Sequence, residues 1–200
     1  WTCCRRWIPR APAFRDNEPS WPDICKMTDP HSMILRPPGE VLWIHATTIE
    51  RYLALCDIGH RLKTMRPDLV VLATWEAEMA EVPKVEGCDF ALGPLPADQT
   101  LETKAFLTQW RPDLCLWAGG DLRRGLLRPM REQGVSALLL DIREKEMPPR
   151  KLRWLPDQRY RMFSGFDAVL TPSKAVHSQL LRGDLSPDRL QLTSPLRLST

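Results

Sequence analysis

The chain has 200 residues, 43% of them hydrophobic and 26% charged, which are the proportions of a soluble globular protein with a sizeable core. Its net charge of +3 is too small to indicate a nucleic-acid partner, and the sequence holds no RNP motif, zinc-finger spacing or long basic run. No segment approaches the roughly 20 consecutive apolar residues of a membrane span, and no signal peptide is visible.

Cysteine and histidine usage argues against a metal centre. None of the six cysteines forms a C-x-x-C pair, and the four histidines are scattered along the chain. Paired spacings of these residues are what zinc sites and disulfide frameworks require. We therefore expect reduced thiols in a cytosolic protein, with no metal and no cofactor.

The N-terminal part of the chain differs in pattern from the rest. Residues 1–39 carry no clear hydrophobic period and hold seven prolines. They predict an irregular lead-in, followed by a single domain at residues 40–200. From residue 41 onward, short apolar runs alternate with longer amphipathic segments, which is typical of a parallel sheet with crossover helices.

The elements of this alternation follow in chain order. The predicted strands are 41–46, 69–73, 88–92, 114–118, 135–140, 168–170 and 190–193. The predicted helices are a segment of about 15 residues after the first strand, then 75–82, 97–110, 121–133, a basic stretch to about residue 163, and 173–181. The fold class is therefore α/β, a Rossmann-like open parallel sheet with helices on both faces.

Polar residues or glycines follow each predicted strand, as in His45–Thr48, 118–121, 141–143 and 193–195. The carboxyl ends of parallel strands meet at one edge of a sheet, and ligands of such folds bind there. One crevice at this edge is therefore the expected site.

Five segments resemble motifs of the Kdo transferases, a family of lipopolysaccharide glycosyltransferases. The segment GEVLWIHATT at 39–48 is similar to the family's opening W-I-H-A strand, and RPDL at 111–114 with 121–127 is similar to its R-P-D-L…E-T-E-L-W-P-N-L-L segment. GVSALLLDIR at 134–143, FDAVLTPS at 166–173 and 192–197 are similar to three later motifs. The five occur in the family's order over about residues 39–198.

The resemblance implies a function. The family consists of two-domain GT-B glycosyltransferases, and this chain resembles the N-terminal, acceptor-side half. It implies Kdo transfer from CMP-Kdo to a lipid A precursor at the cytoplasmic face of the inner membrane, peripheral or anchored by a segment elsewhere. We expect the donor-binding half, which such a site requires, to lie outside this chain.

The resemblance also implies a general base and a set of binding residues. Aligned without gaps, the family's catalytic glutamate falls on Arg51. A one-residue deletion would instead make Glu50 the base, and the alternative for Glu50 is a capping or surface role. The candidate substrate-binding residues are His45, Thr47, Thr48, Asp121, Arg143 and Arg197.

Each of these residues also has a purely structural interpretation. His45 ends a buried strand and suits a hydrogen-bonded core position. Thr47 and Thr48 can cap the following helix, and Asp121 can be the N-cap of the next one. Arg143 can form a salt bridge with Glu144 or Glu146. Arg197 stands where the family has lysine, and a guanidinium does not replace an ammonium group in every contact.

Three functional hypotheses follow. The chain is the acceptor domain of a Kdo-transferase-like enzyme, or a non-catalytic relative that binds a sugar-lipid or a protein partner. A third, unrelated nucleotide-binding Rossmann domain, is disfavoured because no G-x-G-x-x-G follows the first strand. The basic stretch Arg150, Lys151, Arg153, Arg159 and Arg161 fits either an anionic membrane surface or a solvated helix face.

Overall fold

The computed structural model describes residues 38–76, 79, 82–83, 85, 89–95, 100–120, 122–148 and 158–198. These residues form one sheet of seven strands in the order β3-β2-β1-β4-β5-β6-β7. Every neighbouring pair is parallel. The strands are β1 Val41–Ala46, β2 Val70–Trp75, β3 Phe90–Pro94, β4 Leu114–Ala118, β5 Ser136–Leu140, β6 Ala168–Thr171 and β7 Leu190–Leu192.

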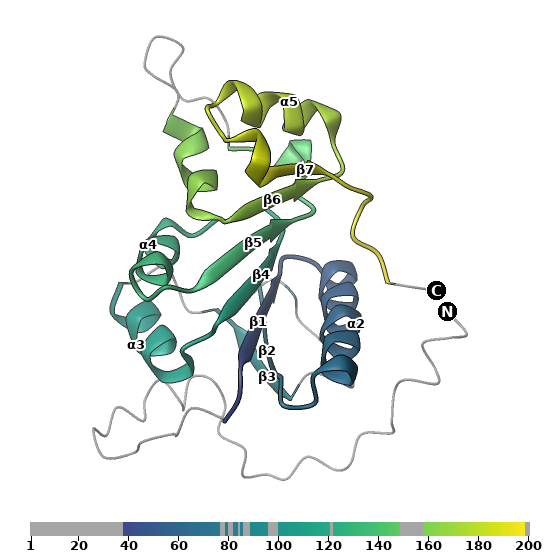
Figure 1. Cartoon of the computed structure of the whole chain (residues 1–200), viewed down its shortest axis with the longest axis vertical. Coiled ribbons are helices and arrows are strands. Elements are labelled where there is room, and N and C mark those ends of the chain that lie inside the picture. The colour runs from purple at the N-terminus through teal and green to yellow at the C-terminus, as the bar shows by residue number, and fades with distance from the viewer. Residues whose placement is uncertain are drawn as a thin grey trace.

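Helices cover both faces of this sheet. Helix α2 lies on one side, and α3 and α4 lie on the other (Figure 1). The helices are α2 Ile49–Met65, α3 Thr100–Trp110, α4 Arg124–Glu132 and α5 Lys174–Arg182, with short 3-10 helices η2 Glu144–Glu146, η3 Gln158–Gly165 and η4 Pro187–Arg189. The predicted α/β class, a Rossmann-like open parallel sheet, is confirmed.

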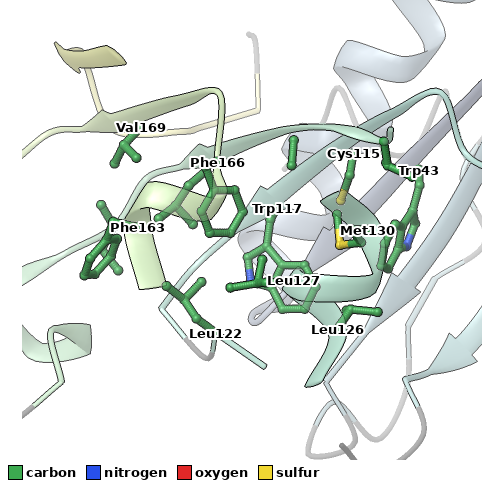
Figure 2. Close-up of a cluster of buried hydrophobic side chains, with 14 of the residues drawn as sticks. Trp43, Cys115, Trp117, Leu122, Leu126, Leu127, Met130, Phe163, Phe166 and Val169 are labelled. Atoms are coloured by element: carbon green, nitrogen blue, oxygen red, sulfur yellow. The ribbon is translucent and has the colours of Figure 1, made fainter. Parts of the chain in front are cut away.

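Strand β1 shows how the sequence divides the core between the two faces. All six of its residues are buried, and successive side chains point to opposite sides of the sheet. Trp43 packs with α3 and α4 in one apolar cluster, whereas Ile44 packs with α2 in the other. Figure 2 shows the first cluster, where Trp117 lies near Leu127 and Phe166. A continuous apolar run is therefore needed, because neither face meets water.

Aspartates organise the amino edge of the sheet. Each of three strands is preceded by an aspartate whose side chain accepts the backbone N–H of a residue in the neighbouring strand. Asp113 Oδ2 lies 2.8 Å from Val41 N, Asp89 Oδ2 lies 3.0 Å from Val71 N, and Asp167 Oδ2 lies 2.9 Å from Ala137 N. These three bonds help to fix the register in which neighbouring strands begin.

Most predicted element positions agree with the structure to within a few residues. Two differ. The described parts of the basic stretch that ends near residue 163 form the short 3-10 helices η2 and η3. The helix expected at 75–82 does not begin at Trp75, since that residue ends β2. The remainder of that segment falls largely outside the described residues, as do residues 1–37 of the lead-in. Within the described ranges, no helix combines the length and the apolar character that crossing a membrane requires.

Candidate functional site

The carboxyl edge of the sheet holds the candidate site. Strand order reverses between β1 and β4, and ligands of open parallel sheets bind beside such a reversal. Backbone bonds continue the ladder just past the strand ends, from Thr47 N to Ala118 O at 3.1 Å and from Gly119 N to Leu140 O at 3.1 Å. The loops after β1, β4 and β5 are therefore held side by side.

A buried arginine lies next to these loops. Arg51, in the first turn of α2, is 2% exposed. Its Nε donates to Asp141 Oδ2 at 2.8 Å, and its Nη2 donates to the Asp141 carbonyl at 2.6 Å. Nη1 donates to Glu146 Oε1 at 2.5 Å and to Thr47 Oγ1 at 2.7 Å, and Nη2 donates to Glu146 Oε2 at 2.9 Å. Every nitrogen of the guanidinium is occupied.

The surroundings of Arg51 keep it charged. Burial alone would lower the pKa of its guanidinium, but the hydrogen bonds and charges of Glu146 and Asp141 outweigh burial and raise that pKa above its ordinary value. A cation in a buried position is tolerated only with such partners. We call Arg51, Asp141, Glu146 and Thr47 the Arg51 cluster.

Asp141 is the branching point of this cluster. Its φ is +56°, a left-handed conformation that non-glycine residues seldom adopt. Besides Arg51, Oδ2 accepts from Arg143 Nη2 at 2.8 Å, and Oδ1 accepts the backbone N–H of Leu196 at 3.2 Å. One side chain thus joins α2, the loop after β5 and the segment after β7. The ion pair expected between Arg143 and Glu144 or Glu146 is made with Asp141 instead.

Two glycines give the cluster its space. A Cβ added to Gly119, whose φ is +119°, would lie 2.0 Å from Thr47 Oγ1 and 2.8 Å from Arg51 Nη1. A Cβ added to Gly120 would lie 2.2 Å from Glu146 Cβ. Any side chain at these two positions would collide with residues of the Arg51 cluster, so the packing of Arg51 requires glycine at both.

A hollow opens above the Arg51 cluster. It has a volume of about 330 Å³ and is lined by residues of four loops: Glu50, Arg143, Glu144, Pro172, Ser173, Pro195 and Arg197. We call it the rim hollow. It brings together three residues that the sequence proposed for the site, namely Glu50, Arg143 and Arg197. Glu50 and Arg197 are exposed, and the Arg143 side chain is 35% exposed.

The charges of the rim hollow suit an acceptor with both hydroxyl and anionic groups. The guanidinium groups of Arg143 and Arg197 can each pair with a phosphate or carboxylate. The Glu50 carboxylate can accept a proton from a hydroxyl group. Ser173 Oγ donates to Glu144 Oε1 at 2.7 Å and also caps α5. These contacts fix the wall of the rim hollow that follows β6.

The other predicted site residues lie elsewhere. Thr48 is the N-cap of α2 and accepts the Arg51 N–H, and Thr47 belongs to the Arg51 cluster. Asp121 lies outside the described residues. His45 is completely buried on the opposite face of β1 from Ile44, so it does not reach the rim hollow.

His45 belongs to a second buried polar group. Its Nε2 lies 3.0 Å from Glu76 Oε1, and its Nδ1 lies 2.9 Å from Thr74 Oγ1. A carboxylate only accepts, so Nε2 carries a proton and donates it to the hydrogen bond with Glu76. Glu76 also accepts from Arg123 Nη2 at 2.7 Å. Despite its burial, which raises the value, the pKa of Glu76 is lowered by His45 and Arg123.

Sequence reasoning missed the role of Arg51, Asp141 and Glu146. One signal was available: Arg51 precedes Leu55, Ile58 and Leu62 by four, seven and eleven residues, so it continues the apolar stripe of α2 toward the sheet. A charged residue in line with a buried stripe needs a counter-ion.

Among the described residues, no group of three histidines, cysteines or carboxylates is arranged to hold a metal ion.

A comparison with known protein families gives a match over most of the chain. The model of the 3-deoxy-D-manno-octulosonic-acid transferase (Kdo transferase) family matches residues 20–200. No curated protein matches the chain.

The fold also recurs in solved structures at low identity. A UDP-N-acetylglucosamine 2-epimerase is 14% identical, with a TM-score of 0.52 over 79% of this chain and 48% of its own. The UDP-N-acetylglucosamine 2-epimerase of Rickettsia bellii is 13% identical, with a TM-score of 0.52 over 79% of this chain and 45% of its own. This chain therefore spans less than half the length of these structures, which show its GT-B-like fold.

Proposed function

The chain belongs to the Kdo transferase family, and we propose on that premise that it is the acceptor-binding domain of a glycosyltransferase that transfers Kdo from CMP-Kdo to a lipid A precursor. The observation that carries the proposal is the rim hollow, which gathers Glu50, Arg143 and Arg197 at the carboxyl edge of the sheet. A donor-binding domain facing this edge would hold CMP-Kdo.

In this proposal each residue of the rim hollow has a role. Arg143 and Arg197 pair with phosphate groups of the lipid A precursor and orient it. Glu50 accepts the proton of the attacking sugar hydroxyl as that oxygen bonds to the anomeric carbon of Kdo and CMP departs. Glu50 suits this role because it is exposed beside the two cations, whereas the neighbouring Arg51 is buried.

The test is transfer of radiolabelled Kdo from CMP-Kdo to a lipid A precursor by the protein expressed from its complete reading frame. We expect Glu50→Gln to lower kcat by about 10²- to 10⁴-fold, the usual contribution of a general base. The matched control is Glu40→Gln, an exposed glutamate at the other edge of the sheet, which should leave transfer unchanged. Full turnover of Glu50→Gln would exclude Glu50 as the base.

A second candidate function is favoured by one observation. Arg51 occupies the position of the family's catalytic glutamate in the ungapped alignment, and its nitrogens are all engaged inside the protein. A non-catalytic relative would keep the acceptor site and lose transfer. Binding of the lipid A precursor by the complete protein, without turnover of CMP-Kdo, would support this alternative.

The proposal includes a location at the cytoplasmic face of the inner membrane, where such an acceptor resides. Support comes from a hollow of about 490 Å³ between α4 and η3, where Arg128, Arg131 and Arg161 outnumber the carboxylate of Glu132 and lie beside Leu127 and Met162. Guanidinium groups over apolar side chains suit an anionic lipid surface. Co-sedimentation with phosphatidylglycerol vesicles, lost at high salt and absent with phosphatidylcholine vesicles, is the expected result.

A further inference from the structure

The walls of the rim hollow come from loops that are far apart in the sequence. Glu50 follows β1, Arg143 follows β5, and Pro195 and Arg197 follow β7. Isolated loops of this kind do not hold side chains at fixed distances. Some internal contact must therefore set the relative positions of Glu50, Arg143 and Arg197.

The Arg51 cluster provides that contact for the three walls that carry Glu50, Arg143 and Arg197. Arg51 is adjacent to Glu50, so its anchoring fixes the first turn of α2. Its bonds to Asp141 and Glu146 fix both ends of the loop that carries Arg143, and the backbone N–H of Arg143 itself donates to Glu146 Oε2 at 2.9 Å. The Leu196 N–H bond to Asp141 Oδ1 then holds the residue between Pro195 and Arg197.

The strain at Asp141 supports a positioning role over a purely stabilising one. A left-handed aspartate persists only where its surroundings over-determine it, and such residues gather at functional sites. Here five bonds hold it, to both side-chain oxygens and to the carbonyl. The strained backbone turns the chain so that Arg143 reaches the rim hollow while Asp141 faces inward.

We infer that Arg51 is a positioning residue, which acts through Asp141 and Glu146 to hold Glu50, Arg143 and Arg197 in register around the rim hollow. The identity of the ligand, a lipid A precursor, rests on the proposed function. The effect of Arg51 on the order of the loops does not depend on that function. Arg51 does not touch the ligand, because it is 2% exposed and does not line the rim hollow.

The test uses Arg51→Lys, which keeps the charge but not the fork of donors that reaches both carboxylates. Amide hydrogen exchange is measured for Leu196 and Arg143, whose N–H groups bond to Asp141 and Glu146. We expect both to exchange about tenfold faster or more, as loss of a bond to a charged group predicts, while the Leu116 amide in β4 is unchanged. Arg66→Lys, an exposed arginine paired with Glu40, is the matched control.

Binding of a lipid A precursor provides the second readout. We expect its Kd to rise about tenfold in Arg51→Lys and to stay constant in Arg66→Lys. Faster exchange of the Leu196 and Arg143 amides in Arg51→Lys with an unchanged Kd would overturn the positioning role. Unchanged exchange of these amides in an Arg51→Lys protein that is only less stable would overturn it as well. If the unmodified protein does not bind the precursor, the proposed acceptor is wrong, and the exchange data still decide the role of Arg51.

A second variant keeps the test decisive if Arg51→Lys fails to fold. Asp141→Asn retains the size of the side chain and its tolerance of positive φ, but it removes the charge that Arg51 and Arg143 share. The same acceleration at Leu196 is expected, because the amide group is a weaker acceptor than a carboxylate. An unaccelerated Leu196 amide in folded Asp141→Asn would contradict the inference.

Discussion

The two edges of the sheet use charged residues in different ways. At the amino edge, the side chains of Asp89, Asp113 and Asp167 each accept one backbone N–H of the neighbouring strand. At the carboxyl edge, Arg51 and its carboxylates bond to one another and to three loops, and further charges remain exposed above them. The amino edge sets strand register, whereas the carboxyl edge forms a hollow with charges available to a ligand.

The comparison predicts the largest effect for removal of the arginine at the carboxyl edge. Arg51→Met preserves much of the side-chain volume but removes the buried cation that Asp141 and Glu146 share, and leaves Asp141 paired with Arg143 alone. We expect the free energy of unfolding to fall by about 3–5 kcal/mol, as for other buried pairs that lose one partner. Urea denaturation measures it. Arg66→Met at the amino edge removes an exposed pair and should not shift the midpoint; equal losses in both variants would erase the distinction.

Two glycines of positive φ sharpen the same contrast. Gly119→Ala at the carboxyl edge meets both backbone strain and contact with Thr47 and Arg51, so we expect a loss of about 3 kcal/mol. Gly134 precedes β5 at the amino edge and has a φ of +74°, and a Cβ added there by Gly134→Ala meets no atom within 4 Å. Backbone strain alone should cost it about 1 kcal/mol. Thermal unfolding of the two variants side by side gives the difference, and a reversed order would disprove the crowding around Arg51.

Acid sensitivity should come from the second polar group at the carboxyl edge. The pKa of Glu76 lies below its ordinary value of 4.5 in the folded protein, so its ionised form contributes stability above that pH. The contribution is lost as the pH falls below 4.5 toward the lowered pKa. Glu76→Gln should lower the free energy of unfolding by about 2 kcal/mol at pH 7 and flatten its decline in acid. A parallel decline in both proteins would show that another group is responsible.

The smallest effect is expected at the amino edge itself. Asp167→Ala removes the acceptor of the Ala137 N–H and should cost about 1 kcal/mol, the net value of one hydrogen bond. The Kd for a lipid A precursor should not change, because β5 and β6 keep their carboxyl ends in place. Weakened binding in this variant would mean that the two edges are not independent.

The sheet could be predicted well because each strand is marked by residues within its own segment. Continuous apolar runs such as Val41–Ala46 are buried on both faces, and proline or glycine ends the segments between them. The sequence also predicted that Glu50, Arg143 and Arg197 follow strands whose carboxyl ends meet. Three residues from distant loops therefore line one hollow, as the topology of a parallel sheet requires.

The Arg51 cluster could not be predicted in the same way. Its partners lie 90 and 95 residues along the chain, and nothing local to Arg51 indicates which carboxylates it meets. The positive φ of Asp141 is likewise imposed by tertiary contacts rather than by the residues beside it. Pairing between distant charged side chains depends on loop geometry, which hydrophobic periodicity does not encode.

A crystal structure of the protein with a bound lipid A precursor tests the central claim most directly, which is that the rim hollow binds the acceptor. We expect a phosphate group of the precursor within hydrogen-bonding distance of the Arg143 or Arg197 guanidinium, and a sugar hydroxyl beside the Glu50 carboxylate. A precursor bound elsewhere at full occupancy, with the rim hollow filled only by solvent, would contradict the claim.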